Sequence, residues 1–276
     1  MEFSHGSPGS GIGRYRDQPA VGTTRGTVLL LHGWGGTSEL NWSHSYGALV
    51  SAGWRVIAPD LPGHGRGARD TSFTLEGAAD AAAGLLQATG AGDVIVAGYS
   101  LGGAVALLVA RRHPDVVAGL VLSGSQASWP SLPPAWLLRL AGRTAAAIPG
   151  PVLRRGGRSI LGVDPERNAW IRGEVSLSSV NHVAQAAAAL RGFDATPWLR
   201  QLRLPTVVLV STRDTFVLPS RQRALAAAIP GAITLDVDMD HSDPPSRPGD
   251  FPRQLLRAVE ACRELDPRHS GAPGNS

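Results

Sequence analysis

Strand-sized apolar runs alternate with helical patterns through most of this 276-residue chain. The runs are almost continuously apolar, which is typical of parallel strands buried on both faces. They lie at residues 27–31, 54–58, 93–97, 117–122, 206–211 and 232–237. The helical patterns between and after them lie at residues 74–88, 101–112, 220–228 and 251–264. This alternation predicts right-handed crossovers and a doubly wound, mostly parallel α/β sheet.

One long segment interrupts the alternation. Residues 126–202 carry no strand signal and are too many for an ordinary loop. Their short helical patterns lie at residues 134–140, 151–160, 165–171, 179–190 and 197–202. We therefore expect a small helical cap at 126–202, inserted before the strand at 206–211 into a core of residues 26–125 and 203–265. Residues 1–25 are predicted to be a flexible lead-in or a weak edge strand, and residues 266–276 a disordered tail.

Composition excludes several classes of protein. The chain is 43% hydrophobic and 17% charged, which indicates a globular domain. Its apolar runs are far shorter than the roughly 20 residues of a membrane span, and its first residues lack a basic start followed by an apolar stretch. From these features we expect a cytoplasmic protein that does not insert stably into a membrane.

Charge and cysteine content exclude certain partners and certain kinds of site. The net charge is +4, but the arginines form no long cluster interleaved with aromatic residues, so we expect no nucleic-acid partner. The single cysteine, Cys262, rules out an internal disulfide and any metal site built from cysteines, and we expect it to be structural. The oligomeric state stays open.

A serine lies where a predicted strand passes directly into a predicted helix. The run is Gly98-Tyr99-Ser100-Leu101-Gly102, after the strand at 93–97. Such a turn forces its central residue into a strained conformation, and the residues two before and two after approach too closely for side chains. Gly103 would ease packing of the helix on the sheet. The serine hydroxyl is then exposed near the helix N-terminus, so Ser100 is the predicted nucleophile.

This arrangement resembles the α/β-hydrolase superfamily, over most of residues 26–265. The segment His32-Gly33-Trp34-Gly35-Gly36 is similar to the family's His-Gly segment, and Asp60-Leu61-Pro62-Gly63-His64-Gly65 is similar to its Asp-x-x-Gly-x-Gly turn. In the family, the residue after His-Gly supplies one oxyanion-hole amide. The resemblance therefore implies an oxyanion hole made by the backbone amides of Trp34 and Leu101.

A serine nucleophile needs an imidazole base, and eight histidines could supply it. His241 is the predicted base because it follows the last predicted strand, after Ser100 in the order that this fold uses. The others lie in predicted tails, glycine turns, an early loop, the end of the helix after Ser100, or the cap. They are His5, His32, His44, His64, His113, His182 and His269.

The imidazole in turn needs a carboxylate. Asp214 follows the strand at 206–211, in a loop that resembles the acid loop of the family, and it is the predicted acid. The competitors Asp238, Asp240 and Asp243 are expected to be carboxylates of a surface loop. Asp240 also departs from the family, which usually has glycine before the catalytic histidine. Some relatives carry the acid one strand earlier, but this chain has Ser123-Gly124-Ser125 there.

The predicted activity is hydrolysis of a small or medium hydrophobic carboxylic ester through an acyl-enzyme at Ser100. No cofactor or metal is expected, because the glycine run at 33–36 lacks the Lys-Ser/Thr ending of a phosphate loop. Four of the seven tryptophans lie in the insertion, either as an apolar lid or as packing anchors: Trp129, Trp136, Trp170 and Trp198. The candidate pocket residues are Trp34, Tyr99, Trp136 and Phe216.

Three alternatives stay open. The same three residues could perform C–C bond, lactone or thioester hydrolysis, acyl transfer, or cofactor-free peroxidation. An epoxide hydrolase or haloalkane dehalogenase would use aspartate as its nucleophile, which Ser100 argues against. A non-catalytic ligand receptor with this fold could retain all three residues.

Overall fold

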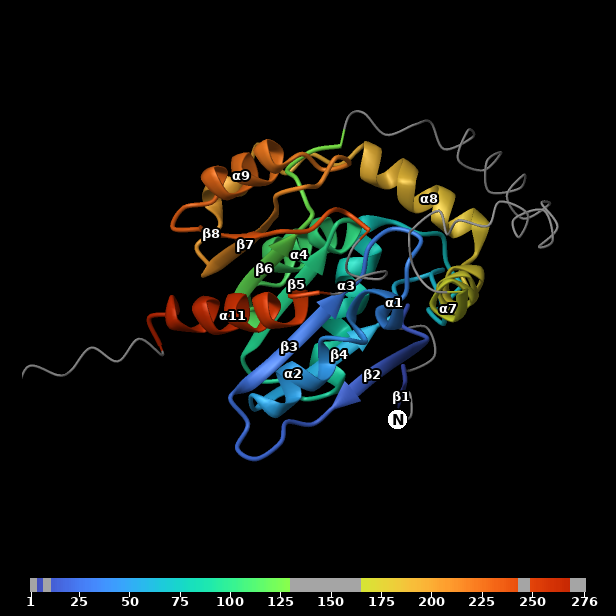
Figure 1. Cartoon of the computed structure of the whole chain (residues 1–276), viewed down its shortest axis with the longest axis horizontal. Helices are drawn as coiled ribbons and strands as arrows, with labels where there is room; N and C mark the ends of the chain where they lie inside the picture. The colour runs from blue at the N-terminus through green and yellow to red at the C-terminus, as the bar shows by residue number, and fades with distance from the viewer. Residues whose placement is uncertain (1–3, 7–10, 130–164, 243–248, 269–276) are drawn as a thin grey trace, which may run out of the picture.

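The predicted alternation forms one eight-stranded sheet in the order β1-β2-β4-β3-β5-β6-β7-β8, with helices on both faces (Figure 1). The computed structural model describes residues 4–6, 11–129, 165–242 and 249–268. The strands are β1 (Ser4–His5), β2 (Arg14–Gln18), β3 (Gly26–Leu31), β4 (Trp54–Pro59), β5 (Val94–Tyr99), β6 (Gly119–Ser123), β7 (Thr206–Ser211) and β8 (Ile233–Val237). All neighbours from β4 to β8 are parallel. The predicted fold class is confirmed.

Helices begin where the sequence carries start signals. The Thr74 hydroxyl accepts the Gly77 N–H at 2.9 Å and caps α3, and Pro219 stands at the first position of α9. The helices are α1 (Ser38–Trp42), α2 (Tyr46–Ser51), α3 (Leu75–Ala88), α4 (Leu101–Arg112), α7 (Pro165–Ser176), α8 (Val180–Arg191), α9 (Pro219–Ala228) and α11 (Phe251–Glu264), with 3₁₀ turns at Pro114–Val116 and Leu199–Gln201. The four helices predicted for the core are confirmed, whereas α1 and α2 were not predicted.

The N-terminal segment contains more strand than its sequence indicates. Strand β1 pairs with β2, and β2 pairs with β4, both antiparallel. The polar residues of β2 are matched by tertiary partners, since Arg55 donates to the Asp17 carboxylate at 2.7 and 2.9 Å and Arg16 donates to Glu39 at 2.6 Å. Pairing to the sheet edge therefore creates strands where local propensity is weak.

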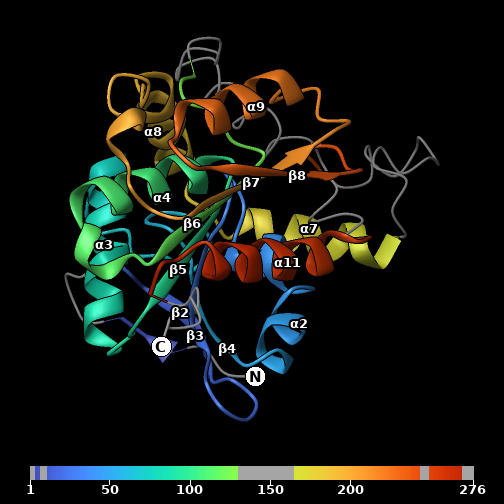
Figure 2. The ribbon, with the colours of Figure 1, turned by 90° about the vertical axis from the view of Figure 1, so that its left-hand side faces the viewer.

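The sheet is buried on both faces. Figure 2 shows α3 and α4 on one side of it and α2 and α11 on the other. Along β3, Leu29 and Leu31 belong to one apolar core, and Val28 and Leu30 belong to the other. Successive side chains of a strand point to opposite faces, so a continuous apolar run fills two cores at once.

Part of the insertion lies outside the described residues, including the predicted helices at 134–140 and 151–160. The helix predicted at 165–171 extends as α7 to Ser176, whereas 197–202 forms only the 3₁₀ turn at Leu199–Gln201. Helices α7 and α8 lie beyond the end of the sheet toward which β3 points (Figure 1). No helix among the described residues is long and apolar enough to cross a membrane.

Packing against the core continues past Leu265, the last residue predicted to belong to it. Asp266, assigned above to a disordered tail, is buried, and Arg268 forms ion pairs with Asp266 at 2.7 Å and with Asp93 at 3.1 Å. Nearby, Cys262 Sγ donates to the Pro205 carbonyl at 3.3 Å, and burial raises the pKa of this thiol to about 12. A buried, protonated thiol suits the structural role expected of Cys262.

Candidate active site

Ser100 sits at a strained junction between β5 and α4. Its φ of 54° and ψ of −113° make it the one non-glycine residue with positive φ in the described chain. A Cβ added at Gly98 would lie 2.3 Å from the Gly102 carbonyl oxygen, and one added at Gly102 would lie 2.1 Å from the Leu31 carbonyl oxygen. Both glycines are thus required by close backbone approach, as the sequence predicted.

Three residues from separate loops form one hydrogen-bonded chain. His241 Nδ1 lies 2.8 Å from Asp214 Oδ2, and His241 Nε2 lies 3.1 Å from Ser100 Oγ. In the tautomer that a general base requires, His241 Nδ1–H donates to Asp214 and Nε2 accepts from the Ser100 hydroxyl. The structure therefore brings together the predicted nucleophile, base and acid, although they are 27 to 141 positions apart.

Asp214 is held by further donors. Its Oδ1 accepts the backbone N–H groups of Phe216 at 2.9 Å and Val217 at 2.7 Å, and its Oδ2 accepts from the Gln222 side-chain amide at 3.3 Å. The side chain is fully buried. Gln222 is eight positions along in α9, and nothing in the sequence pattern marked it. These bonds orient the carboxylate toward the imidazole.

The competing carboxylates have other partners. Asp238 is exposed and pairs with Arg213 at 2.7 Å. Asp240, which stands where the family usually has glycine, accepts from the backbone N–H and the hydroxyl of Ser242 at 2.7 and 2.8 Å. Asp243 lies outside the described residues.

Two further residues shape the surroundings of His241. The Tyr99 hydroxyl donates to the His241 carbonyl, and the two rings lie 5.3 Å apart. Gly124, with φ of 54°, follows β6, and a Cβ there would lie 3.3 Å from His241 Cε1. Tyr99 was predicted only as a pocket residue, and Gly124 had no predicted role. The ring and the glycine together leave space for the imidazole.

The loop after β3 is held by buried polar contacts. His32 Nδ1–H donates to the Gly33 carbonyl at 2.8 Å, while His32 Nε2 accepts the Leu61 N–H at 2.9 Å. The Gly33 N–H donates to Asn41 Oδ1 at 2.7 Å. No sequence pattern marked Asn41. These contacts position the segment that carries Trp34 beside the junction of Ser100.

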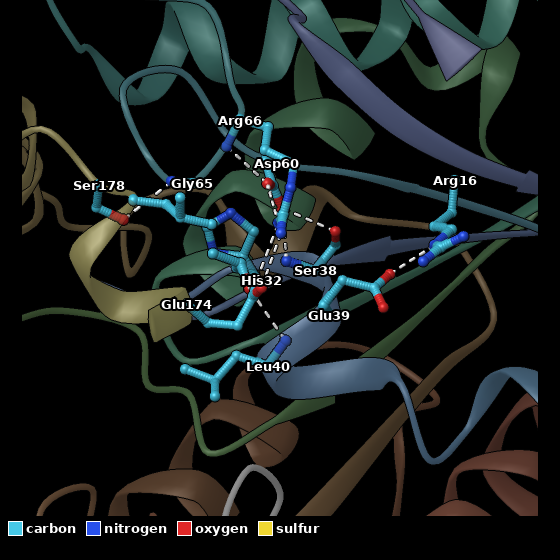
Figure 3. Close-up of polar contacts among 12 residues, drawn as sticks. Arg16, His32, Ser38, Glu39, Leu40, Asp60, Gly65, Arg66, Glu174 and Ser178 are labelled. Carbon is cyan, nitrogen blue, oxygen red and sulfur yellow. Dashed lines mark hydrogen bonds and ion pairs between the residues drawn. The ribbon is translucent and has the colours of Figure 1, made fainter. Parts of the chain in front are cut away.

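The inserted segment is joined to this loop region by a buried carboxylate (Figure 3). Glu174 in α7 accepts from the Thr37 hydroxyl at 2.7 Å and from the Arg66 guanidinium at 2.8 and 3.0 Å. Burial alone would raise the pKa of Glu174, but the Arg66 and Thr37 hydrogen bonds hold it below its ordinary value. Thr37 caps α1 directly after the glycine run, so α7 contacts the loop at its end.

Asp60 completes this network from the end of β4 (Figure 3). Its Oδ1 accepts the N–H and the hydroxyl of Ser38, each at 2.7 Å, and its Oδ2 accepts the Arg66 N–H at 2.8 Å. Asp60 thus bonds both the start of α1, at Ser38, and the far end of its own Asp-x-x-Gly-x-Gly turn, at Arg66. The Glu174–Arg66 ion pair of this network need not add net stability, but removing Arg66 would leave the Glu174 carboxylate buried without this partner.

Two buried imidazoles in these turns are expected to make folding acid-sensitive. Burial lowers the pKa of His64 from 6.5 to about 3, and burial also lowers the pKa of His32 despite nearby Asp60. Both rings are neutral in the fold but would bind protons in the unfolded chain. The stabilisation from a neutral His64 is therefore complete above about pH 6.5 and is lost as the pH falls toward 3, by about 1.4 kcal/mol per pH unit. His32 acts in the same direction.

Urea unfolding at pH 7, 6, 5 and 4 measures this effect against His64→Phe. The variant should show a shallower fall in the free energy of unfolding, by about 1.4 kcal/mol per pH unit. Equal slopes for the two proteins would contradict the assignment of His64 as a buried neutral ring.

A cavity of about 430 Å³ opens over Ser100 and His241. Its wall is mostly apolar and includes the predicted pocket residues Trp34, Tyr99 and Phe216; Trp136 lies outside the described residues. Other side chains that line it come from α1, α7 and α8: Leu40, Asn41, Val175, Ala187 and Leu190. Helices of the insertion thus form part of the cavity wall.

The described tryptophans of the insertion favour packing over a lid. Trp129 and Trp198 are buried, and Trp198 packs against Phe193 at 6.4 Å. Trp170 lies under the Arg167 guanidinium at 4.2 Å. None of the three is among the described residues that line the cavity.

Comparison with known proteins agrees with this architecture. The family model for the alpha/beta hydrolase fold matches residues 26–244. The chain belongs to the α/β-hydrolase fold family.

Individual relatives indicate the class of reaction. A pimeloyl-[acyl-carrier protein] methyl ester esterase of Aromatoleum aromaticum is 33% identical over 225 residues, which cover 75% of this chain and 87% of the relative. One of Sodalis glossinidius is 32% identical over 208 residues, covering 71% and 79%. The structure of a thermophilic esterase from Thermogutta terrifontis superposes with a TM-score of 0.72 at 26% identity, covering 95% and 98%. These comparisons support an α/β-hydrolase enzyme of the carboxylic ester hydrolase class.

Proposed function

We propose that this protein is a serine esterase whose catalytic triad is Ser100, His241 and Asp214. The observation that carries the proposal is the continuous chain of hydrogen bonds from Asp214 through His241 to Ser100 beneath an apolar cavity. A serine hydroxyl is a weak nucleophile until an adjacent imidazole removes its proton, and that imidazole needs a fixed tautomer. The three residues satisfy both requirements.

The reaction proceeds in two steps. Ser100 Oγ attacks the ester carbonyl carbon while its proton passes to His241 Nε2, and the tetrahedral oxyanion accepts from the backbone N–H groups of Trp34 and Leu101. The C–O bond to the alcohol then breaks as His241 returns the proton to the departing oxygen. Water, deprotonated by His241, attacks the acyl-enzyme; the acid leaves and Ser100 regains its proton.

The oxyanion hole is supported by position. Leu101 is the first residue of α4, and the first N–H groups of a helix have no partner within the helix. Trp34 follows Gly33, whose backbone is held by Asn41. A single such donor contributes about 3 kcal/mol to transition-state stabilisation in measured cases.

The substrate class is a small or medium hydrophobic carboxylic ester. The apolar cavity supports an uncharged acyl group, and the relatives named as methyl ester esterases favour a small alcohol. C–C bond, lactone or thioester hydrolysis, acyl transfer and peroxidation use the same residues, so a substrate panel with product mass spectrometry must accompany the ester assays.

A fluorophosphonate probe tests the proposal directly. Attack by Ser100 Oγ forms a P–O bond and expels fluoride, so intact-mass analysis should show one label on the wild type and almost none on His241→Ala, which lacks the base. Ser123→Ala should label fully, because Ser123 is another buried serine at a strand end. An unlabelled wild type would favour the non-catalytic receptor instead. In a p-nitrophenyl ester series, kcat/KM should peak at short or medium acyl chains.

A further inference from the structure

One side-chain amide in the cavity wall forms a hydrogen bond through its oxygen but not through its NH₂ group, as far as the described residues show. Asn41 in α1 is 7% exposed and lines the cavity over Ser100. Its Oδ1 accepts the Gly33 N–H at 2.7 Å. Because a backbone N–H can only donate, this bond assigns the oxygen of the carboxamide, and the NH₂ group must be the other branch.

The NH₂ group has no partner within the described parts of the chain. Nδ2 is not among the fully buried side-chain atoms without a partner, so the NH₂ group has surface open to the cavity that Asn41 lines. A donor open to a cavity is free to bond an acceptor of a ligand bound there. Among the residues that line the same cavity, the side chains of Leu40, Val175, Leu190 and Phe216 offer no acceptor. A bound substrate that brings an acceptor would therefore satisfy Asn41 Nδ2.

The position of Asn41 is set by the fold. Thr37 caps α1 by accepting the Leu40 N–H at 3.0 Å, and Asp60 accepts from Ser38 one residue later (Figure 3). Gly33, to which Asn41 is bonded, lies beside the nucleophile, since a Cβ added there would lie 3.5 Å from Ser100 Cβ. Asn41 is thus held in the wall of the cavity that also contains Ser100, next to the glycine that approaches the nucleophile.

We infer that Asn41 determines specificity for esters with an oxygen acceptor a few bonds from the scissile carbonyl, to which Nδ2 donates. This inference rests on the proposed esterase function and refines its substrate class. Asn41 then has two roles: Oδ1 positions Gly33, and Nδ2 contacts the substrate.

Three p-nitrophenyl esters of equal length test the inference: pentanoate, ethoxyacetate and 3-methoxypropanoate. Each ether has an oxygen where pentanoate has a methylene. kcat/KM is measured for the wild type, Asn41→Asp, which keeps an acceptor for the Gly33 N–H, and Asn41→Leu, which keeps neither group. Comparing ether-to-pentanoate ratios between enzymes cancels the intrinsic reactivity of each ester.

For at least one ether, the ratio should fall by about tenfold in both variants, the value of one hydrogen bond. In Asn41→Leu, kcat for pentanoate should fall as well, because the Gly33 N–H loses its acceptor. Unchanged ratios for both ethers would overturn the specificity role and leave Asn41 as a positioning residue. If the wild type cleaves no ester and takes no fluorophosphonate label, the proposed function itself has failed. Labelling and thermal melts of each variant check that it folds.

Discussion

Replacing Ser100 by alanine is expected to lower kcat/KM for p-nitrophenyl esters by a factor of about 10⁶. The variant cannot form the acyl-enzyme, and His241 then has no hydroxyl from which to take a proton. Some hydrolysis should remain, because the oxyanion donors and the cavity still bind the transition state. His241→Ala should lose a comparable factor, and the double variant little more, since residues that act as a unit do not contribute additively.

The matched control is Ser123→Ala. Ser123 is also buried at the carboxyl end of a strand, in β6 beside β5, and its hydroxyl has no hydrogen-bond partner among the described residues. Removing an unsatisfied hydroxyl should leave activity within about twofold, because no interaction is lost. Steady-state rates of purified proteins decide the matter. A Ser100→Ala enzyme that keeps more than about 1% of wild-type activity would contradict the nucleophile assignment.

Replacing Gly102 by alanine is expected to destabilise the fold by about 3 kcal/mol, although alanine favours helix. The added Cβ would lie 2.1 Å from the Leu31 carbonyl oxygen, which is backbone and cannot rotate away. Relief requires moving α4 away from β3, and this shift would also displace Ser100. Activity should therefore fall together with stability.

Gly84→Ala isolates the steric effect. Gly84 lies in α3, and a Cβ there would meet no described atom within 4 Å apart from its own helical turn. Helix propensity then acts alone and should raise the free energy of unfolding by about 0.5–1 kcal/mol. Urea denaturation of both variants gives the comparison. Changes of the same sign would show that close approach at the Ser100 junction does not require glycine.

Much of the fold could be predicted because its signals are local. Helix α4 ends at Arg112 as expected, and β7 spans Thr206–Ser211 as expected. In both cases a buried run and its flanking breakers are contiguous in sequence. The serine turn was equally readable, since Gly98, Ser100 and Gly102 are within five positions of one another.

Other features depend on partners that are distant in sequence. Strand β2 has a polar sequence and forms by pairing with β4. Helices α1 and α2 are five and six residues long, too short to carry a full periodic pattern. The contact between Glu174 and Thr37 joins residues 137 positions apart. No pattern within a short stretch of sequence indicates a contact between residues so far apart.

Local sequence was enough to predict the alternating α/β architecture, the strained position of Ser100 and the order along the chain of the proposed nucleophile, acid and base. Those properties follow from backbone sterics and hydrophobic periodicity, which act over a few residues. The distances among Ser100, His241 and Asp214, the apolar cavity above them and the bond from Gly33 to Asn41 could be known only from the folded chain. These depend on packing between elements, because a contact forms only where the fold brings two distant segments together.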